Sequence, residues 1–244
     1  MNRIKDYDEQ KKAIEVVYAH GNKILISLDT LEYNCYTWNN QSANDLYLIE
    51  RFYDLIKEDS VVLDIGAQSG AFTLLSKFFP KTKWYSFEPD PVNYDLLVKN
   101  LTINSITNVN TFDVGISNKI GNDELKICRS HRGLNNYGDR ITRFDSNSDD
   151  TIIVNTPIDT IDNLFLDQNV DLIKIDAEGC EYNILCGGKN VIQKNKPKIL
   201  LEYYEQNLLQ FGKNFCDLHK LIDEINYEIV ESFGQDILIQ HKGV

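Results

Sequence analysis

A short apolar run that leads directly into a glycine-rich turn constrains this fold more than any other feature. Residues 61–63 are Val-Val-Leu, and residues 64–70 read Asp-Ile-Gly-Ala-Gln-Ser-Gly. The β-branched run predicts a buried parallel strand, and residues 71–79, ended by Pro80, predict a helix. A strand, a glycine turn and a helix in this order bring the backbone of an α/β protein close to a nucleotide-like ligand, because a Cβ would block both the turn and the ligand.

The spacing of the glycines narrows the class of ligand. Gln68 stands where the dinucleotide fingerprint G-x-G-x-x-G has its middle glycine, and no P-loop lysine follows the turn. The turn therefore predicts an adenosyl group without phosphates, rather than a dinucleotide. The predicted ligand contacts in the turn are Asp64, Gly66, Ala67, Gln68, Ser69 and Gly70.

An acid at the end of the next predicted strand is consistent with a nucleoside. Glu88 follows Gly66 by about 20 residues, the spacing at which a carboxylate binds ribose hydroxyls in nucleotide-binding α/β proteins. A solvated acid at a strand end is the alternative. Pro89 and Pro91 favour the ribose interpretation, because they open the next helix and direct Glu88 toward the edge of the sheet.

Three segments carry a resemblance to a known family. Residues 61–73 (VVLDIGAQSGAFT) resemble motif I of the class I S-adenosylmethionine-dependent methyltransferases. Residues 87–101 (FEPDPVNYDLLVKNL) and 171–188 (DLIKIDAEGCEYNILCGG) resemble the FkbM-type methyltransferases, and the segments follow the order of that family. Gln68 departs from the Asn that is usual in the family but keeps its amide chemistry.

The resemblance implies S-adenosyl-L-methionine as the cofactor and S-adenosyl-L-homocysteine as the product. It also implies O-methylation of a hydroxyl of a sugar, a sugar nucleotide or a glycan. Asp64 is expected to have a structural and electrostatic role, in which it holds the N–H groups of the turn and faces the amino acid part of the cofactor. Three other functions stay open: O-methylation of another secondary-metabolite hydroxyl, non-catalytic binding of the cofactor, and nicotinamide-dependent dehydrogenation, against which the missing middle glycine argues.

The order of predicted elements indicates the fold class. Strand and helix patterns alternate through residues 60–244, which predicts a mostly parallel sheet with helices on both faces. The last two predicted strands, 227–231 and 237–240, have no helix between them and predict an antiparallel hairpin. The resemblance implies that this is the Rossmann-like seven-stranded sheet of a class I methyltransferase domain.

Residues 1–59 are expected to form a small N-terminal extension packed on that domain. Residues 11–18 have a helix-like pattern, residues 23–38 suggest a hairpin, and residues 43–57 form an amphipathic helix pattern. The apolar side of the last helix is expected to pack against the sheet.

Acids follow the predicted strands one by one, where ligands bind in such sheets. Asp176 is the predicted catalytic residue, which would orient the acceptor hydroxyl or take its proton, with Glu178 and Glu202 as second choices. Glu178 is equally consistent with an acid that stabilises a helix N-terminus. Asp113 and Val114 are predicted to contact the adenine, although a turn-capping Asp113 is an equal alternative. These acids have the chemistry to bind a hard metal ion, but no Asp-Asn pair follows them, so we expect no metal.

The arginines are unevenly distributed. The chain has six, and four of them lie between residues 129 and 143. Because guanidinium groups bind phosphate and carboxylate with two bonds, this segment suggests an anionic acceptor, either a diphosphate or an acidic glycan. A solvated loop with surface ion pairs is an equal alternative. The predicted acceptor contacts are Arg129, His131, Arg132 and Asn135, and His131 is also an alternative general base.

Bulk properties exclude several classes of protein. The net charge of −12 disfavours nucleic acid as a partner. The five cysteines are scattered, which indicates reduced thiols rather than a disulfide framework or zinc site. No apolar run approaches the ~18 residues of a membrane span, and the first residues lack the apolar region of a signal peptide. We therefore expect a cytoplasmic protein.

Overall fold

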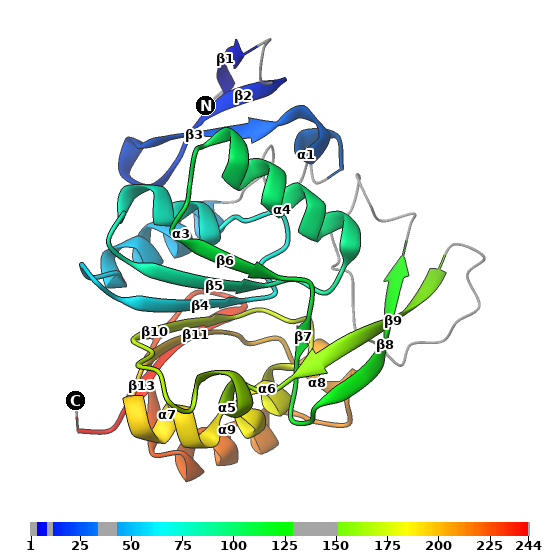
Figure 1. The fold of residues 1–244 in the computed structure, drawn as a ribbon. Coiled ribbons are helices and arrows are strands. Elements are labelled where there is room, and N and C mark those ends of the chain that lie inside the picture. Colours follow the sequence, from blue (N-terminus) through cyan, green and yellow to red (C-terminus); the bar gives the residue numbers. More distant parts are fainter. Residues whose placement is uncertain (1–3, 9–11, 34–42, 129–150, 244) are drawn as a thin grey trace.

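A seven-stranded sheet forms the centre of the computed structural model, which describes residues 4–8, 12–33, 43–128 and 151–243. The strand order is β12-β13-β11-β10-β4-β5-β6 (Figure 1). The strands are β4 (Val61–Ile65), β5 (Lys83–Phe87), β6 (Val109–Phe112), β10 (Leu172–Ile175), β11 (Lys198–Glu202), β12 (Tyr227–Ser232) and β13 (Asp236–His241). All pairs are parallel except β11–β13 and β12–β13, which are antiparallel. The expected Rossmann-like sheet with its terminal hairpin is confirmed.

The strand order creates a switch point beside β4. The chain runs outward from β4 through β5 to β6 and then returns to place β10 against the other side of β4. Ile65 at the end of β4 pairs with Phe87 of β5 and with Ile175 of β10. The segments that follow these three strands therefore emerge side by side, where open α/β sheets bind their ligands.

Helices cover both faces of the sheet (Figure 1). Alternate residues of a strand point to opposite faces. Val62 accordingly joins a hydrophobic cluster with one set of helices, and Leu63 joins a second cluster with another set. The first set is α3 (Ala43–Leu55), the 3₁₀ helix η2 (Thr73–Phe78) and α4 (Pro91–Ile103). The second set is α5 (Ile161–Phe165), α6 (Glu181–Gly187), α7 (Lys189–Asn195), α8 (Glu205–Gln210) and α9 (Phe215–Glu224).

The N-terminal residues form a small antiparallel sheet of order β1-β2-β3. Its elements are β1 (Ile4–Asp8), β2 (Ala13–Val17), η1 (Ala19–Gly21) and β3 (Lys23–Ser27), and α1 (Leu28–Tyr33) follows. The expected helix over residues 11–18 is wrong, because pairing of β2 with both neighbours outweighs the local preference. The expected hairpin within residues 23–38 is also wrong where the structure describes it. There the Ser27 hydroxyl accepts the Thr30 N–H at 3.2 Å and a helix begins.

The N-terminal sheet packs on α4. The Ser27 N–H donates to Asn100 Oδ1 at 3.0 Å, and the Leu25 N–H donates to Asn104 Oδ1 at 2.9 Å. Ile24 and Ile26 are fully buried in the same cluster as Leu97 of α4. The expected helix at residues 43–57 is observed as α3. The division into an extension and a domain at residue 60 stays a prediction.

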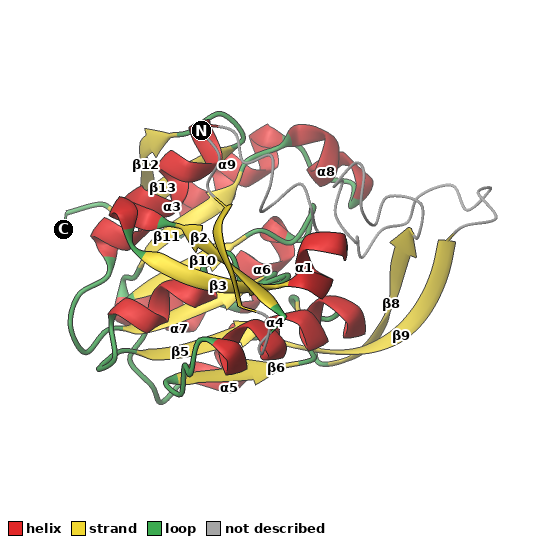
Figure 2. Cartoon of the chain, turned by 90° about the horizontal axis from the view of Figure 1, so that it is seen from above, coloured by secondary structure: helices red, strands yellow, loops and turns green. Residues whose placement is uncertain are grey.

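A second small sheet, of order β7-β9-β8, projects from the side of the molecule where β6 ends (Figures 1 and 2). It consists of β7 (Gly115–Ile116), β8 (Gly121–Cys128) and β9 (Thr151–Asp159). The strands β8 and β9 are antiparallel partners. The arginine-rich residues 129–150 between β8 and β9 lie outside the described residues.

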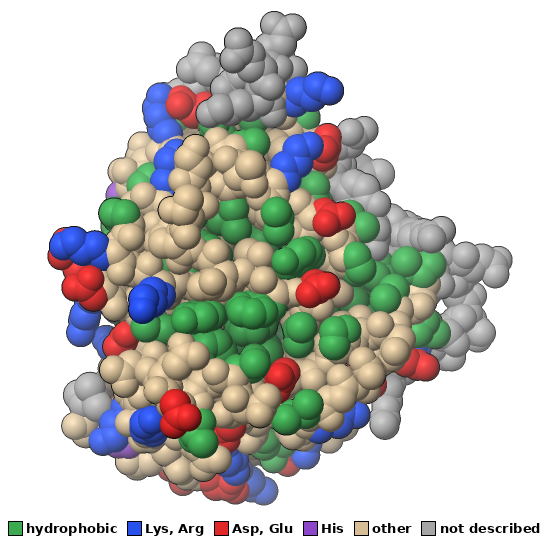
Figure 3. Space-filling view, viewed as in Figure 1, with side chains coloured by type: hydrophobic (Ala, Val, Ile, Leu, Met, Phe, Trp, Pro, Cys, Tyr) green, Lys and Arg blue, Asp and Glu red, His purple; other side chains and the backbone are tan. Residues whose placement is uncertain are grey.

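Aromatic side chains of β5 and of the edge strand β6 are only partly covered. Figure 3 shows hydrophobic side chains gathered across the middle of the face drawn there. The half-buried Tyr85 of β5 and Phe112 of β6 stack with ring centroids 6.4 Å apart. None of the helices in the described part of the chain has both the length and the apolar character to cross a membrane.

Candidate active site

The turn after β4 is fixed against both neighbouring strands. Gly66 has φ +76°, and a Cβ built on it would lie 1.8 Å from the Asp176 carbonyl oxygen that follows β10. The N–H groups of Gly66 and Ala67 both donate to the Phe87 carbonyl at the end of β5, at 3.0 Å. Only glycine fits this position, because the turn passes directly over the chain that leaves β10.

Glu88 is bonded to the same turn. Its Oε2 accepts the Gln68 N–H at 2.7 Å, and its Oε1 accepts the Asp90 N–H at 2.9 Å. Glu88 is only 5% exposed, and this burial raises its pKa to about 7, although the N–H groups of Asp90 and Gln68 oppose the shift. Each carboxylate oxygen keeps acceptor capacity for a further donor, such as a ribose hydroxyl.

A buried lysine connects the turn to the predicted catalytic acid. Lys174 Nζ donates to the Gly66 carbonyl at 2.7 Å and lies 3.5 Å from Asp64 Oδ1 and 3.4 Å from Asp176 Oδ2. Lys174 is 4% exposed. Burial lowers its pKa, but the charges of Asp176 and Asp64 outweigh burial and raise the pKa above its ordinary value. The lysine therefore stays charged and holds the two carboxylates on either side of the turn.

Asp64 occupies a different position from the expected one. Its side chain is fully buried, and its Oδ2 accepts from the Thr73 hydroxyl at 2.5 Å while Oδ1 faces Lys174. Of the turn N–H groups that we expected Asp64 to hold, that of Gln68 donates to Glu88, and those of Gly66 and Ala67 donate to the Phe87 carbonyl. Asp64 of β4 is the register partner of Lys174 of β10. The positive charge of the lysine therefore offsets the negative charge of Asp64 beneath the turn.

Three carboxylates meet where β10 and β11 end. Oxygen atoms of Asp176, Glu178 and Glu202 lie within 4.8 Å of one another. Asn207 Nδ2 donates to Glu178 Oε2 and to Glu202 Oε1, at 2.9 Å in both cases. Burial raises the pKa of Glu202 well above its ordinary value, and the nearby charges of Glu181, Asp176 and Glu178 raise it further.

The chain between Asp176 and α6 is held in an unusual conformation. Glu178 has φ +52°, a left-handed value that is uncommon outside glycine. Glu181 at the start of α6 accepts the N–H groups of Ala177 at 2.9 Å and Gly179 at 3.1 Å. Glu181 therefore acts as a structural acid at the start of α6, whereas Glu178 belongs to the carboxylate group.

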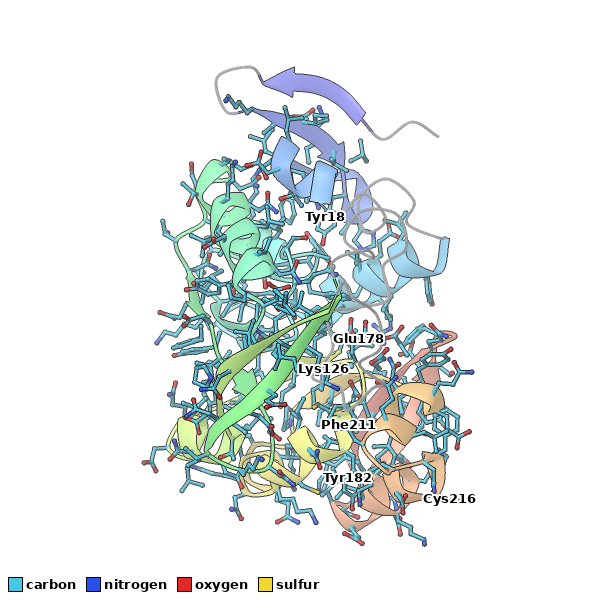
Figure 4. All side chains as sticks on the ribbon, turned by 90° about the vertical axis from the view of Figure 1, so that its right-hand side faces the viewer. Tyr18, Lys126, Glu178, Tyr182, Phe211 and Cys216 are labelled. Carbon is cyan, nitrogen blue, oxygen red and sulfur yellow. The ribbon has the colours of Figure 1, made fainter. Side chains whose placement is uncertain are left out.

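Asn207 is a site residue that no sequence pattern indicated. It is 2% exposed, and its backbone oxygen packs so closely on Gly179 that a Cβ there would lie 2.4 Å away. Phe211 packs on the same glycine. Figure 4 shows Glu178 and Phe211 on the face where the parallel strands end. A lone Asn in a short helix gives no pattern by which to find it, because its role depends on how α8 folds back over the site.

The other predicted residues fall into two groups. Asp113 is exposed after β6, Val114 and Pro89 are half-buried, and Ser69 is buried with its carbonyl bonded to Asn100 Nδ2 at 2.9 Å. The predicted acceptor residues Arg129, His131, Arg132 and Asn135 lie outside the described residues. The structure therefore brings together the glycine turn, Glu88 and the strand-end acids, but gives no position for the acceptor residues.

Comparison with known proteins identifies the family. The chain matches the methyltransferase FkbM domain over residues 64–229. It is 24% identical over 195 residues to methyltransferase sdnD of Sordaria araneosa, covering 67% of this chain and 74% of that protein. It is 26% identical over 207 residues to the 2-O-methyltransferase NoeI of Sinorhizobium fredii, covering 75% and 78%.

A solved structure shares the fold. The FkbM methyltransferase of Methylobacillus flagellatus superposes with a TM-score of 0.51 at 20% identity, over 77% of this chain. The match covers 45% of that protein, so this chain spans less than half of its length. Since the FkbM domain matches well over half of the residues, the chain belongs to the FkbM methyltransferase family and is a methyltransferase.

Proposed function

We propose that this enzyme transfers the methyl group of S-adenosyl-L-methionine to a hydroxyl oxygen of a sugar, a sugar nucleotide or a glycan, and releases S-adenosyl-L-homocysteine. One observation carries the proposal. The Gly66 turn, Glu88 and Asp176 converge at the ends of three adjacent parallel strands, and Glu88 is bonded to the backbone of the turn. The similarity to a protein named as a 2-O-methyltransferase supports a hydroxyl acceptor.

The residues present fit the cofactor. Glu88 is a buried carboxyl whose only donors among the described residues are two backbone N–H groups, so it is suited to accept ribose hydroxyls. The turn of residues 66–70 would hold the nucleoside, with Asp113 and Val114 toward the adenine. The cofactor supplies a methyl group already activated on a sulfonium, so the protein has mainly to align it with the acceptor. Alignment of this kind contributes up to ~7–11 kcal/mol to a reaction barrier.

Asp176 is the proposed group that contacts the acceptor. Its side chain is 42% exposed, and its distance of 3.4 Å from Lys174 fixes one of its oxygens. The other oxygen is positioned to orient a hydroxyl or to accept its proton, a contribution of typically ~10²–10⁴-fold to the rate. Glu178 and Glu202 are second choices, and His131 stays a hypothesis as an alternative base.

The chemical class of the acceptor and the cellular location of the protein are further proposals. The arginine-rich segment lies between β8 and β9, two strands that project at the end of the sheet where the site lies (Figure 2). Arg129, His131, Arg132 and Asn135 would bind an anionic group of the acceptor there. The net charge of −12 still argues against nucleic acid as that acceptor. A cytoplasmic location is proposed from the sequence alone.

Cofactor binding tests the first half of the proposal. S-Adenosylhomocysteine should bind and raise the melting temperature, whereas NAD should not. Glu88→Gln should weaken binding about tenfold or more, because a charge-assisted hydrogen bond contributes ~1.5–3 kcal/mol. Glu228→Gln, an exposed acid on the edge strand β12, is the control and should bind as the parent does. Binding of NAD in preference to S-adenosylhomocysteine would overturn the proposal.

Transfer of a labelled methyl group to a library of sugars, sugar nucleotides and other secondary-metabolite hydroxyls tests the second half. We expect turnover with a sugar hydroxyl, reduced at least 100-fold in Asp176→Asn, with the cofactor affinity retained. Turnover only with non-sugar hydroxyls would establish the alternative acceptor class. Tight cofactor binding without turnover of any hydroxyl would favour a non-catalytic binding module.

A further inference from the structure

The three carboxylates at the ends of β10 and β11 are spaced as ligands of one ion. Oxygens of Asp176, Glu178 and Glu202 lie within 4.8 Å of one another. Hard divalent cations bind oxygen at about 2.0–2.6 Å, so two ligands on opposite sides of one ion are about 4–5 Å apart. A single ion therefore fits among these oxygens with little movement of the side chains.

The arrangement is held in place by groups that are not themselves ligands. The buried Asn207 amide donates one hydrogen to Glu178 and one to Glu202, which orients both carboxylates from behind. Lys174 does the same for Asp176 on its other side. Such supporting hydrogen bonds orient ligands at metal sites.

The surroundings of one oxygen in this carboxylate group favour a bound cation. In the part of the chain that the structure describes, Glu202 Oε2 is buried and has no hydrogen-bond partner. The charged groups that surround Glu202 are all acids, Glu181, Asp176 and Glu178, and the Glu181 carboxyl lies within hydrogen-bond reach of it. A buried acceptor among other acceptors is costly unless a proton or a cation joins it.

We propose that Asp176, Glu178 and Glu202 bind a divalent cation of the hard, oxygen-preferring class, such as Mg²⁺ or Mn²⁺. The sequence predicted no metal because no Asp-Asn pair follows the strands; the fold supplies Glu178 and Glu202 instead. The ion would lie beside the Gly66 turn, since a Cβ on Gly66 would touch the Asp176 backbone. There it would bind the acceptor oxygen and lower the pKa of its hydroxyl, a role that rests on the proposed function.

Titration of the full-length protein with Mn²⁺, followed by electron paramagnetic resonance without cofactor or acceptor, tests this site. We expect one saturable site, bound at least tenfold more weakly by Glu202→Gln and by Glu178→Gln. Glu228→Gln, an exposed acid on β12, should bind as the parent does. Circular dichroism checks that each variant is folded, and the two cluster variants are independent, so the loss of one to misfolding leaves the other.

The outcomes are separate from those of the proposed function. Absence of saturable Mn²⁺ binding, or equal affinity in the parent and both cluster variants, overturns the metal site and indicates that a proton occupies Glu202. Saturable binding that depends on Glu202 or Glu178 supports the site, even if S-adenosylhomocysteine fails to bind. Failure of cofactor binding bears on the proposed function alone.

Discussion

At the scale of single residues, the burial of Glu88, the proposed ribose-binding residue, has a cost to stability. Its carboxyl is buried, and its pKa is raised to about 7 from an ordinary value of 4.5. The folded state therefore disfavours the ionised form. The unfolded carboxyl ionises first as the pH rises, so the contribution of Glu88 to stability is fully present below about pH 4.5 and is lost as the pH rises through about 7.

The resulting prediction concerns the pH dependence of unfolding. Between pH 4.5 and 7.5, Glu88 should lower the free energy of unfolding of the ligand-free protein by roughly 3 kcal/mol. Denaturant unfolding of the parent and of Glu88→Gln should give a difference between the two proteins that changes by about that amount over this range, since Gln does not titrate. A difference that is constant with pH would contradict the buried, titrating Glu88.

Asp64 and Asn207 mark the limit of prediction at this scale. Position after a strand was enough to predict that Glu88 and Asp176 lie at the same edge of the sheet, because parallel strands end together. The same position in the sequence did not show that Asp64 would be enclosed with Lys174 and Thr73 beneath the turn. Asn207 could not be found at all, because its two carboxylate partners come from separate segments of the chain.

At the scale of elements, the Gly66 turn depends on two different properties of glycine. One is the positive φ of +76°, and the other is the close approach of the Asp176 carbonyl oxygen, which lies 1.8 Å from the place that a Cβ would take. Gly212 has a similar φ of +69° but nothing within 4 Å of a Cβ. The two positions therefore separate conformational strain from steric contact.

We predict different results for alanine at the two positions. Gly212→Ala should cost about 1–2 kcal/mol of unfolding free energy, the strain of a left-handed residue alone. Gly66→Ala should cost at least about 2 kcal/mol more, because the turn must move off β10, and it should weaken S-adenosylhomocysteine binding at least tenfold. Calorimetric unfolding and titration measure both effects. Equal stability losses in the two variants would show that contact with Asp176 is unimportant.

The elements themselves were predictable where burial alone decides them. The strands β4, β5, β10 and β11 are short apolar runs between helix patterns, and they occur where the sequence predicted them. The prediction of a helix over residues 11–18 failed because residues 13–17 form β2 by pairing with β1 and β3. The short α8 was missed because a six-residue helix with one fully buried leucine leaves little periodicity to detect.

At the scale of the whole molecule, one buried side chain connects the N-terminal residues to the candidate site. Asn100 of α4 is fully buried. Its Oδ1 accepts the Ser27 N–H at 3.0 Å, and its Nδ2 donates to the Ser69 carbonyl in the glycine turn at 2.9 Å. The proposed extension is thus bonded, through one amide, to the turn that would hold the cofactor.

This connection predicts that Asn100→Ala lowers both the free energy of unfolding and the affinity for S-adenosylhomocysteine. The Ser27 N–H and the Ser69 carbonyl would both lose a buried partner, at about 1–3 kcal/mol each, so the free energy of unfolding should fall by roughly 2–6 kcal/mol. Release of Ser69 should also weaken S-adenosylhomocysteine binding several-fold in calorimetric titration. Thr102→Ala, an exposed change on the same helix, should alter stability by no more than about 0.5 kcal/mol and leave binding unchanged. If Asn100→Ala lost stability but bound S-adenosylhomocysteine like the parent, the N-terminal sheet would support the fold without supporting the site.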